Sequence, residues 1–194
     1  MTKASKNNAL REFDEDEARQ LAFEIIGSAF EIFAEVWLKP SEGERFRVDA
    51  VARCPVKGYL IGLEFKRSFL TMSEFSNALR QAIDYRSASI DDNRLGLSNG
   101  QRLNCCLVFP DWDGLHEDGP EFYRKEALGM RMLAQHFRVG VLSRTQIKGS
   151  DSFVIGTSGV WHSRSGWTHV AKGILEGKRR HGSRSKRFDQ TISH

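Results

Sequence analysis

The segment from Val48 to Tyr85 constrains the fold of this chain more than any other stretch. It includes most of a short strand-like run at 45–53 and all of a second at 59–66, separated by a turn sequence with Pro and Gly. A helical pattern follows at 74–89, with apolar residues at three- and four-residue spacing. The segment therefore predicts a strand hairpin backed by a helix.

Charged residues stand at defined places in this hairpin. Asp49 lies in the first strand, and Glu64 and Lys66 end the second. Residues i and i+2 of a strand point to the same side, so Glu64 and Lys66 project together. A hairpin would bring Asp49 beside Glu64, and two adjacent carboxylates repel each other unless a cation lies between them.

Such a pair of carboxylates is typical of a hydrolytic metal site. Mg²⁺ prefers oxygen ligands together with water and phosphate oxygens, and Mn²⁺ is the alternative ion. Lys66 would contact the attacking water or the phosphoryl oxygens. These residues predict a Mg²⁺-dependent nuclease. The alternative is a turn aspartate with an ordinary cross-strand surface pair.

The predicted helix carries further candidates. Gln81 and Tyr85 are spaced i, i+4 and share one face, from which they would hydrogen-bond water or backbone oxygens of the site. Arg80 and Arg86 flank them and would hold the strand that is cut. Arg67, at the end of the second strand, is a candidate for phosphate contacts. The alternative is an ordinary helix surface with a half-buried tyrosine.

In this order, Asp49, Glu64-Phe65-Lys66 and Gln81-x-x-x-Tyr85 resemble the PD-(D/E)XK nuclease superfamily, in particular its RecB-like and phage-exonuclease branch. The resemblance covers about 24–145, with its specific motifs confined to 49–85. One departure is Val48, which stands where a proline often precedes the aspartate.

The resemblance implies an α/β, restriction-endonuclease-like fold with an αβββαβ core, in which helices flank a mixed central sheet. It implies that Asp49 and Glu64 bind a divalent metal and that Lys66 assists the water. Gln81 and Tyr85 would position the site, and DNA would be the substrate. The superfamily also includes nucleases that act on RNA and members that have lost activity, and both stay open as alternatives.

A long apolar pattern over 15–38 predicts one helix, covered on two sides or used in a dimer contact. Glu24, Glu31 and Glu35 would share one face of it. The resemblance implies that a first-helix glutamate joins the metal site. Glu24, which precedes Asp49 by 25 residues, is favoured over the other two. The alternative is a solvated acidic face.

The second half of the chain continues the alternation of strands and helices. We predict a buried strand at 103–109, a helix at 121–137, a short strand at 139–143 and an added hairpin at 152–162. The acidic segment Asp111–Pro120 is interpreted as a flexible loop and not as a second metal site.

Charge and composition predict three regions, namely an N-terminal arm at 1–13, the nuclease-like domain at 14–162 and a basic tail at 163–194. The whole chain has a net charge of +4, but from Arg164 onward eight Lys or Arg face only two acids. Such a tail raises affinity for phosphate backbones, and its alternative is a disordered solubilising end. The candidate tail contacts are Lys178, Arg179 and Arg180.

The three cysteines, Cys54, Cys105 and Cys106, fit neither a disulfide framework nor a zinc site, which favours a reducing cytoplasm. No apolar run reaches the roughly 18 residues of a membrane span, and the polar N-terminus is not a signal peptide. We therefore expect DNA as the partner, no membrane and no organic cofactor. Endonuclease and exonuclease action both stay open.

Overall fold

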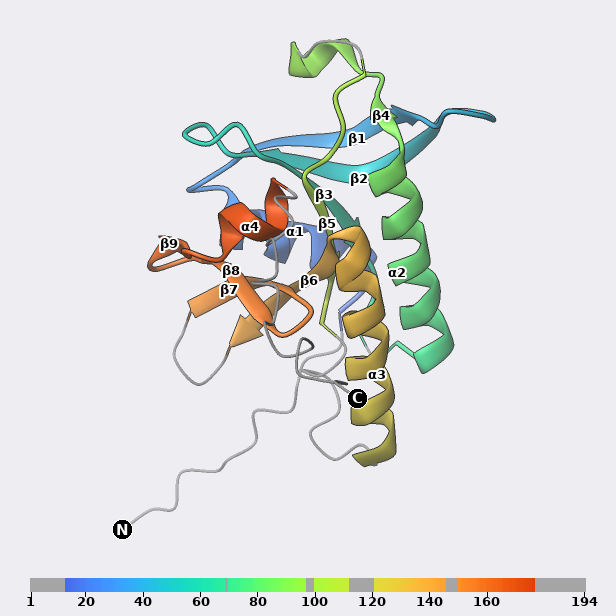
Figure 1. Ribbon diagram of the computed structural model, residues 1–194, viewed down its shortest axis with the longest axis vertical. Helices are drawn as coiled ribbons and strands as arrows, with labels where there is room; N and C mark the ends of the chain where they lie inside the picture. Colours follow the sequence, from blue (N-terminus) through green and yellow to red (C-terminus); the bar gives the residue numbers. More distant parts are fainter. Residues whose placement is uncertain (1–12, 69, 97–99, 112–120, 146–149, 177–194) are drawn as a thin grey trace, which may run out of the picture.

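The computed structural model describes residues 13–68, 70–96, 100–111, 121–145 and 150–176. Within them, a single mixed sheet has the strand order β4-β1-β2-β3-β5-β6-β7-β8-β9. Figure 1 shows that this sheet is strongly twisted and that helices pack on it. The expected α/β class is confirmed. No helix of the described residues is long and apolar enough to cross a membrane.

The strands are mostly five to nine residues long, with two-residue strands at the edges. They are β1 (Glu31–Lys39), β2 (Phe46–Arg53), β3 (Leu60–Phe65), β4 (Ser89–Ile90), β5 (Cys105–Phe109), β6 (Val139–Thr145), β7 (Ser150–Ile155), β8 (Ser158–His162) and β9 (Gly166–Trp167). The helices are α1 (Glu15–Ile26), α2 (Met72–Ser87), α3 (Glu121–Ala134) and α4 (Ala171–Leu175), with 3-10 turns η1 (Asn93–Leu95) and η3 (Gln135–Phe137).

Only β3, β5 and β6 pair in parallel, and the strands on either side of them pair antiparallel. Helix α2 connects β3 to β5, and α3 connects β5 to β6. Figure 1 shows α2 and α3 side by side. They contribute to one hydrophobic cluster, and α1 and α4 contribute to a second. The strands between them contribute to both, so the core has two layers separated by the sheet.

Most elements predicted after residue 45 are confirmed within a few residues. The hairpin of β2 and β3 forms, as does the added hairpin of β7 and β8. All five residues of β5 are buried, as expected for a central strand. Helix α2 starts two residues earlier than predicted because Thr71 and Glu74 form a capping box ahead of it.

The predicted helix over 15–38 is wrong in its second half, where the chain forms β1. Helix α1 begins with a capping box of Asp14 and Glu17 and ends at Gly27, whose N–H donates to the carbonyl of Phe23 at 2.8 Å. A Cβ at Gly27 would lie 2.6 Å from that carbonyl oxygen, so any other residue would force the backbone at the end of α1 to shift.

The apolar residues that suggested a broad helix surface are instead divided between the two faces of β1. This strand is rich in β-branched and aromatic residues, which favour a pleated surface. Val36 and Leu38, two residues apart, are fully buried against the α2 side. The broad apolar surface, which was the reason to expect a dimer contact, is therefore explained by burial within one chain.

The backbone of β1 is irregular at Glu35, and the apolar side chains before and after this residue pack on opposite faces of the sheet. Glu35 has a φ of 51°, in the left-handed region that non-glycine residues rarely adopt. Ile32 and Val36 would face the same side of a regular strand, yet they pack in clusters on opposite faces. Because Ala34 pairs with Ala50 and Val36 with Val48, Glu35 lies opposite Asp49.

The packed chain extends beyond the domain boundaries expected at 14 and 162. Phe13, assigned to the arm, forms three hydrogen bonds with Ser68 and stacks on Phe109 with ring centroids 6.2 Å apart. At the other end, Leu175 is fully buried. Residues 1–12 and the remainder of the predicted tail, with Lys178, Arg179 and Arg180, lie outside the described residues.

Candidate functional site

The ladder between β2 and β3 ends where Asp49 stands, and this places its carboxylate in the sheet. Regular pairing stops at Ala50 and Leu63. Beyond it, Asp49 Oδ2 accepts a hydrogen bond from the backbone N–H of Phe65 at 2.8 Å. The carboxylate of Asp49 thus takes the place of a main-chain carbonyl as the acceptor for the N–H of Phe65. The predicted proximity of Asp49 to the Glu64-Phe65-Lys66 segment is present in the structure.

Glu64 is a buried carboxylate with one unsatisfied oxygen. Its side chain is only 2% exposed, and Oε1 forms an ion pair with Lys66 Nζ at 2.5 Å. Oε2 is buried and has no hydrogen-bond partner. A buried polar atom without a partner costs free energy, on the order of 1–3 kcal/mol and more for a charged group.

The pKa of Glu64 reflects this environment. Burial raises it, and the neighbouring charge of Asp49 raises it further, while contacts with Lys66 and Tyr85 lower it. The result is a pKa of about 7, against an ordinary value of 4.5. The fold therefore holds a carboxylate poised between its charged and neutral forms at neutral pH.

Lys66 follows the last residue of β3 and reaches the same point. Its backbone N–H donates to the carbonyl of Phe109, which fixes this end of β3 against β5. Burial alone would lower the pKa of Lys66, but contact with Glu64 and the charges of Glu15 and Asp49 outweigh burial and raise it. Lys66 is therefore a protonated donor at neutral pH.

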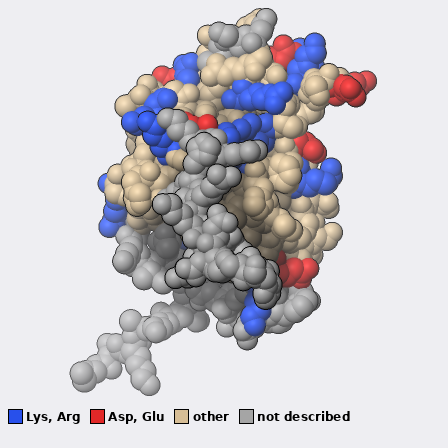
Figure 2. Space-filling view, viewed as in Figure 1, with Lys and Arg blue, Asp and Glu red and all other residues tan. Residues whose placement is uncertain are grey.

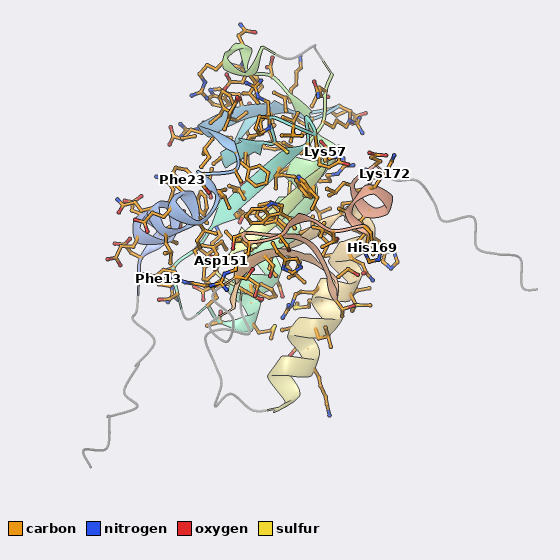
Figure 3. All side chains as sticks on the ribbon, turned by 90° about the vertical axis from the view of Figure 1, so that its left-hand side faces the viewer. Phe13, Phe23, Lys57, Asp151, His169 and Lys172 are labelled. Atoms are coloured by element: carbon orange, nitrogen blue, oxygen red, sulfur yellow. The ribbon has the colours of Figure 1, made fainter. Side chains whose placement is uncertain are left out.

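Glu15, in the first turn of α1, is an acidic neighbour of Lys66 that the sequence did not predict. It is placed there by contacts at both ends of α1, marked by Phe13 and Phe23 in Figure 3. Phe13 stacks on Phe109, and Phe23 meets Phe65 edge-on with centroids 5.7 Å apart. The only sequence signal was the acidic first turn of the helix.

Tyr85 on α2 completes the described site. Its ring is buried and packs on Phe46 with centroids 5.6 Å apart. Burial, together with the charge and hydrogen bonding of Glu64, raises the pKa of the hydroxyl above its ordinary value. Gln81 lies one turn earlier and is half-buried, but it is not among the principal groups that shift the pKa of Glu64 or Tyr85.

The three glutamates expected on one helix face are separated in the structure. Glu24 remains on α1, is exposed and is not among the principal groups that shift the pKa of Glu64 or Lys66, so the proposed site does not include it. Glu31 and Glu35 lie on β1, where they accept hydrogen bonds from Arg53 at 2.7 Å and Arg47 at 3.2 Å. The expectation that they share a face is wrong because α1 ends before Glu31.

The basic candidates occupy different places. Arg67 pairs with Glu74 at 2.9 Å, and Arg80 pairs with Asp84 at 3.5 Å on the exposed side of α2. Burial lowers the pKa of Arg86, and the charges of Arg138 and Arg102 lower it further. Of these three arginines, Arg67 is next to Lys66 in the chain.

A divalent cation fits the donors of this site in part. Asp49 and Glu64 supply two carboxylates, and the unpaired Oε2 of Glu64 is the kind of atom that a cation would satisfy. No cluster of three His, Cys, Asp or Glu occurs in the described part of the chain. With only two carboxylates from the protein, the site fits Mg²⁺, which keeps several waters, better than Ca²⁺.

Comparison with protein-family models, curated proteins and solved structures finds no match to this chain. The chemistry of Asp49, Glu64 and Lys66 is therefore the basis for the function proposed below.

Proposed function

We propose that this protein is a Mg²⁺- or Mn²⁺-dependent nuclease that hydrolyses phosphodiester bonds of DNA. The observation that carries the proposal is the buried carboxylate of Glu64, which lies beside a second carboxylate and has an oxygen without a partner. A side chain that destabilises the fold in this way is typical of an active site.

The order of the elements supports the proposal. Helix α1, the three strands β1 to β3, α2 and β5 follow one another as α, βββ, α and β, with only the two-residue strand β4 and the turn η1 inserted. This is the order that the resemblance to the PD-(D/E)XK superfamily implies. Asp49 and Glu64 belong to the second and third strands of that order, and Lys66 directly follows the third.

In the proposed site, Asp49 and Glu64 would hold the cation. When bound, it would supply charge neutralisation at the phosphate and acidify a bound water. Lys66 would donate to the attacking water or to a phosphoryl oxygen. Because its pKa is raised, orientation of the water is favoured over deprotonation by this side chain.

Tyr85 and Gln81 would support the site from α2. The raised pKa of Tyr85 keeps its hydroxyl protonated, so it can donate to Glu64 but not act as a base. Gln81 would have to act through water, since its place one turn from Tyr85 does not bring it among the principal partners of Glu64. Both are positioning residues in this proposal.

The bound strand would be held by positive charge outside the site. Arg67 adjoins Lys66 but is paired with Glu74, so binding a phosphate there requires an exchange of partners. The tail from Arg164 onward carries a net charge of +6 and would add affinity that is independent of sequence. The cytoplasm is the proposed compartment, in agreement with three free cysteines.

A nucleic-acid-binding protein without cleavage activity is the second candidate. The observation in its favour is the ion pair between Lys66 and Glu64 at 2.5 Å, which compensates the buried charge partly without any cation. A protein that had lost activity could keep this pair for the structure alone.

The test is a cleavage assay on supercoiled plasmid and on end-labelled linear DNA, with Mg²⁺, Mn²⁺ or EDTA. We expect metal-dependent cleavage by the wild type and none by Lys66→Ala, and the products will distinguish endonuclease from exonuclease action. Glu24→Gln, an exposed position on α1, is the matched control and should cut normally.

Salt-sensitive binding of DNA without cleavage by the wild type would favour the second candidate. Cleavage of RNA in preference to DNA of the same sequence would correct the substrate while leaving the site in place.

A further inference from the structure

Three arginines from separate segments come together at the end of the sheet away from Lys66. Arg86 lies in the last turn of α2. Arg102 precedes β5, and its backbone bridges Ser89 just beyond that helix. Arg138 precedes β6, and its carbonyl accepts the N–H of Cys106 at 3.1 Å. Lys66, in contrast, is held at the carboxyl end of β5.

These arginines lack the acidic partners that most of the other described arginines have. In the described part of the chain, no carboxylate forms an ion pair with any of the three. The arginines that do pair with carboxylates are Arg19, Arg45, Arg47, Arg53, Arg67, Arg80, Arg94 and Arg131. Most of the described arginines therefore have a carboxylate within ion-pair distance, but Arg86, Arg102 and Arg138 do not.

The guanidinium groups have free hydrogen-bonding capacity. Arg86 Nε is buried without a partner. One N–H of Arg138 donates to the carbonyl of Leu175 at 3.0 Å, which anchors the side chain and leaves its other donors available. Arg102 is exposed. Burial lowers the pKa of Arg86, and the charges of Arg138 and Arg102 lower it further, so both of these arginines repel the charge of Arg86.

A helix terminus alone does not account for this arrangement. The C-terminal end of α2 favours a cation, and this applies to Arg86 in its last turn. It does not explain why Arg102 and Arg138 add two like charges at the same place. An anion would remove the repulsion and satisfy the buried Nε. The planar guanidinium fork matches the oxygens of a phosphate group.

We propose that Arg86, Arg102 and Arg138 form a second site that binds a phosphate group, separate from the Asp49–Glu64 site. Figure 2 shows Lys and Arg side chains, interspersed with Asp and Glu, on the upper part of the visible face, where Figure 1 places β4 and the end of α2. If the proposed function is right, the occupant is a phosphodiester of the bound nucleic acid. A free phosphate or nucleotide has the same chemistry and is distinguished by the test.

The first measurement uses inorganic phosphate and the full chain in EDTA. Thermal unfolding is followed in phosphate and in chloride at equal ionic strength. We expect phosphate to raise the Tm of the wild type, since an anion that binds only the folded state stabilises it. Arg102→Gln, an exposed position, should lose this rise, and Arg45→Gln, also exposed and ion-paired with Asp91, should retain it.

The second measurement is the affinity for a fluorescent DNA oligonucleotide as a function of salt, again in EDTA. A phosphodiester occupant predicts that Arg102→Gln weakens binding by about tenfold and lowers the salt slope by about 1. Arg86→Lys keeps the charge but removes the fork, and it should weaken binding less. Arg45→Gln should bind as the wild type does.

Loss of the phosphate effect without a change in DNA affinity would identify a free phosphate or nucleotide as the occupant. Equal responses of Arg102→Gln and Arg45→Gln to both ligands would refute the second site. Neither measurement needs cleavage, so the second site can stand or fail independently of the nuclease proposal.

Discussion

Replacing Glu64 by glutamine should make the protein more stable at alkaline pH, although it removes a side chain of the proposed active site. The folded pKa of Glu64 is raised, so the folded protein binds this proton more tightly than the unfolded chain does. Stability from this group is therefore fully present below pH 4.5 and is lost as the pH rises through about 7.

The magnitude follows from the two pKa values. At about 1.4 kcal/mol for each pKa unit, the difference between 4.5 and about 7 corresponds to a loss of about 3 kcal/mol between pH 4.5 and pH 8. Glutamine cannot ionise and resembles the protonated acid. The substitution also leaves the Lys66 ammonium without its partner, which is destabilising. Because the Lys66 side chain is 22% exposed, water can hydrogen-bond to it and reduce this destabilisation. We expect a net gain of about 1–3 kcal/mol at pH 8.

The assay is urea unfolding of the wild type, Glu64→Gln and Glu24→Gln at pH 5 and pH 8.5. Urea is chosen because guanidinium would screen the charges. The wild type and the exposed control should lose stability in parallel as the pH rises, and Glu64→Gln should lose less. Parallel profiles of all three proteins would refute the reasoning that Glu64 carries a raised pKa.

Three further predictions concern the site and the sheet. Mg²⁺ at pH 8 should raise the Tm of the wild type but not of Asp49→Asn, because a ligand of the folded state stabilises it; equal shifts would place the ion elsewhere. Tyr85→Phe removes a contact that lowers the pKa of Glu64, so the acidic limb of the pH–rate profile should move to higher pH, and an unchanged limb would contradict this. Gly140→Ala should destabilise the protein by about 3 kcal/mol or more in urea, because its Cβ would lie 2.0 Å from the carbonyl oxygen of Val154; a stable variant would mean that β6 and β7 separate easily.

The sequence predicted the hairpin that carries Asp49 and Glu64 better than it predicted the chain before residue 45. The site depends on residues within one hairpin, where strand periodicity determines that Glu64 and Lys66 project together. The turn between the strands is short, so register follows from local chemistry. The proximity of Asp49 to this segment was inferred in the same way and is present in the structure.

The boundary between α1 and β1 could not be read from hydrophobic spacing. Apolar residues at 32, 33, 36 and 37 fit one side of a helix as well as the two faces of a strand. What decides between them is the tight exit at Gly27, together with burial of Val36 and Leu38 beneath α2, which depends on tertiary packing.

Residues brought in by distant contacts were also beyond prediction. Glu15 reaches the neighbourhood of Lys66 because Phe13 is anchored by Ser68, 55 residues later in the chain. The cluster of Arg86, Arg102 and Arg138 is assembled by the crossover from α2 to β5 and by the pairing of β5 with β6. No local pattern in the sequence reports such long-range pairing.

The most direct test of the central claim combines stability and activity in one variant. Glu64→Gln should be at least as stable as the wild type at pH 8 and should fail to cut plasmid DNA in Mg²⁺, while Glu24→Gln cuts normally. That result would show that the buried carboxylate is retained for catalysis at a cost in stability. Wild-type rates of metal-dependent cleavage by Glu64→Gln would contradict the proposed site.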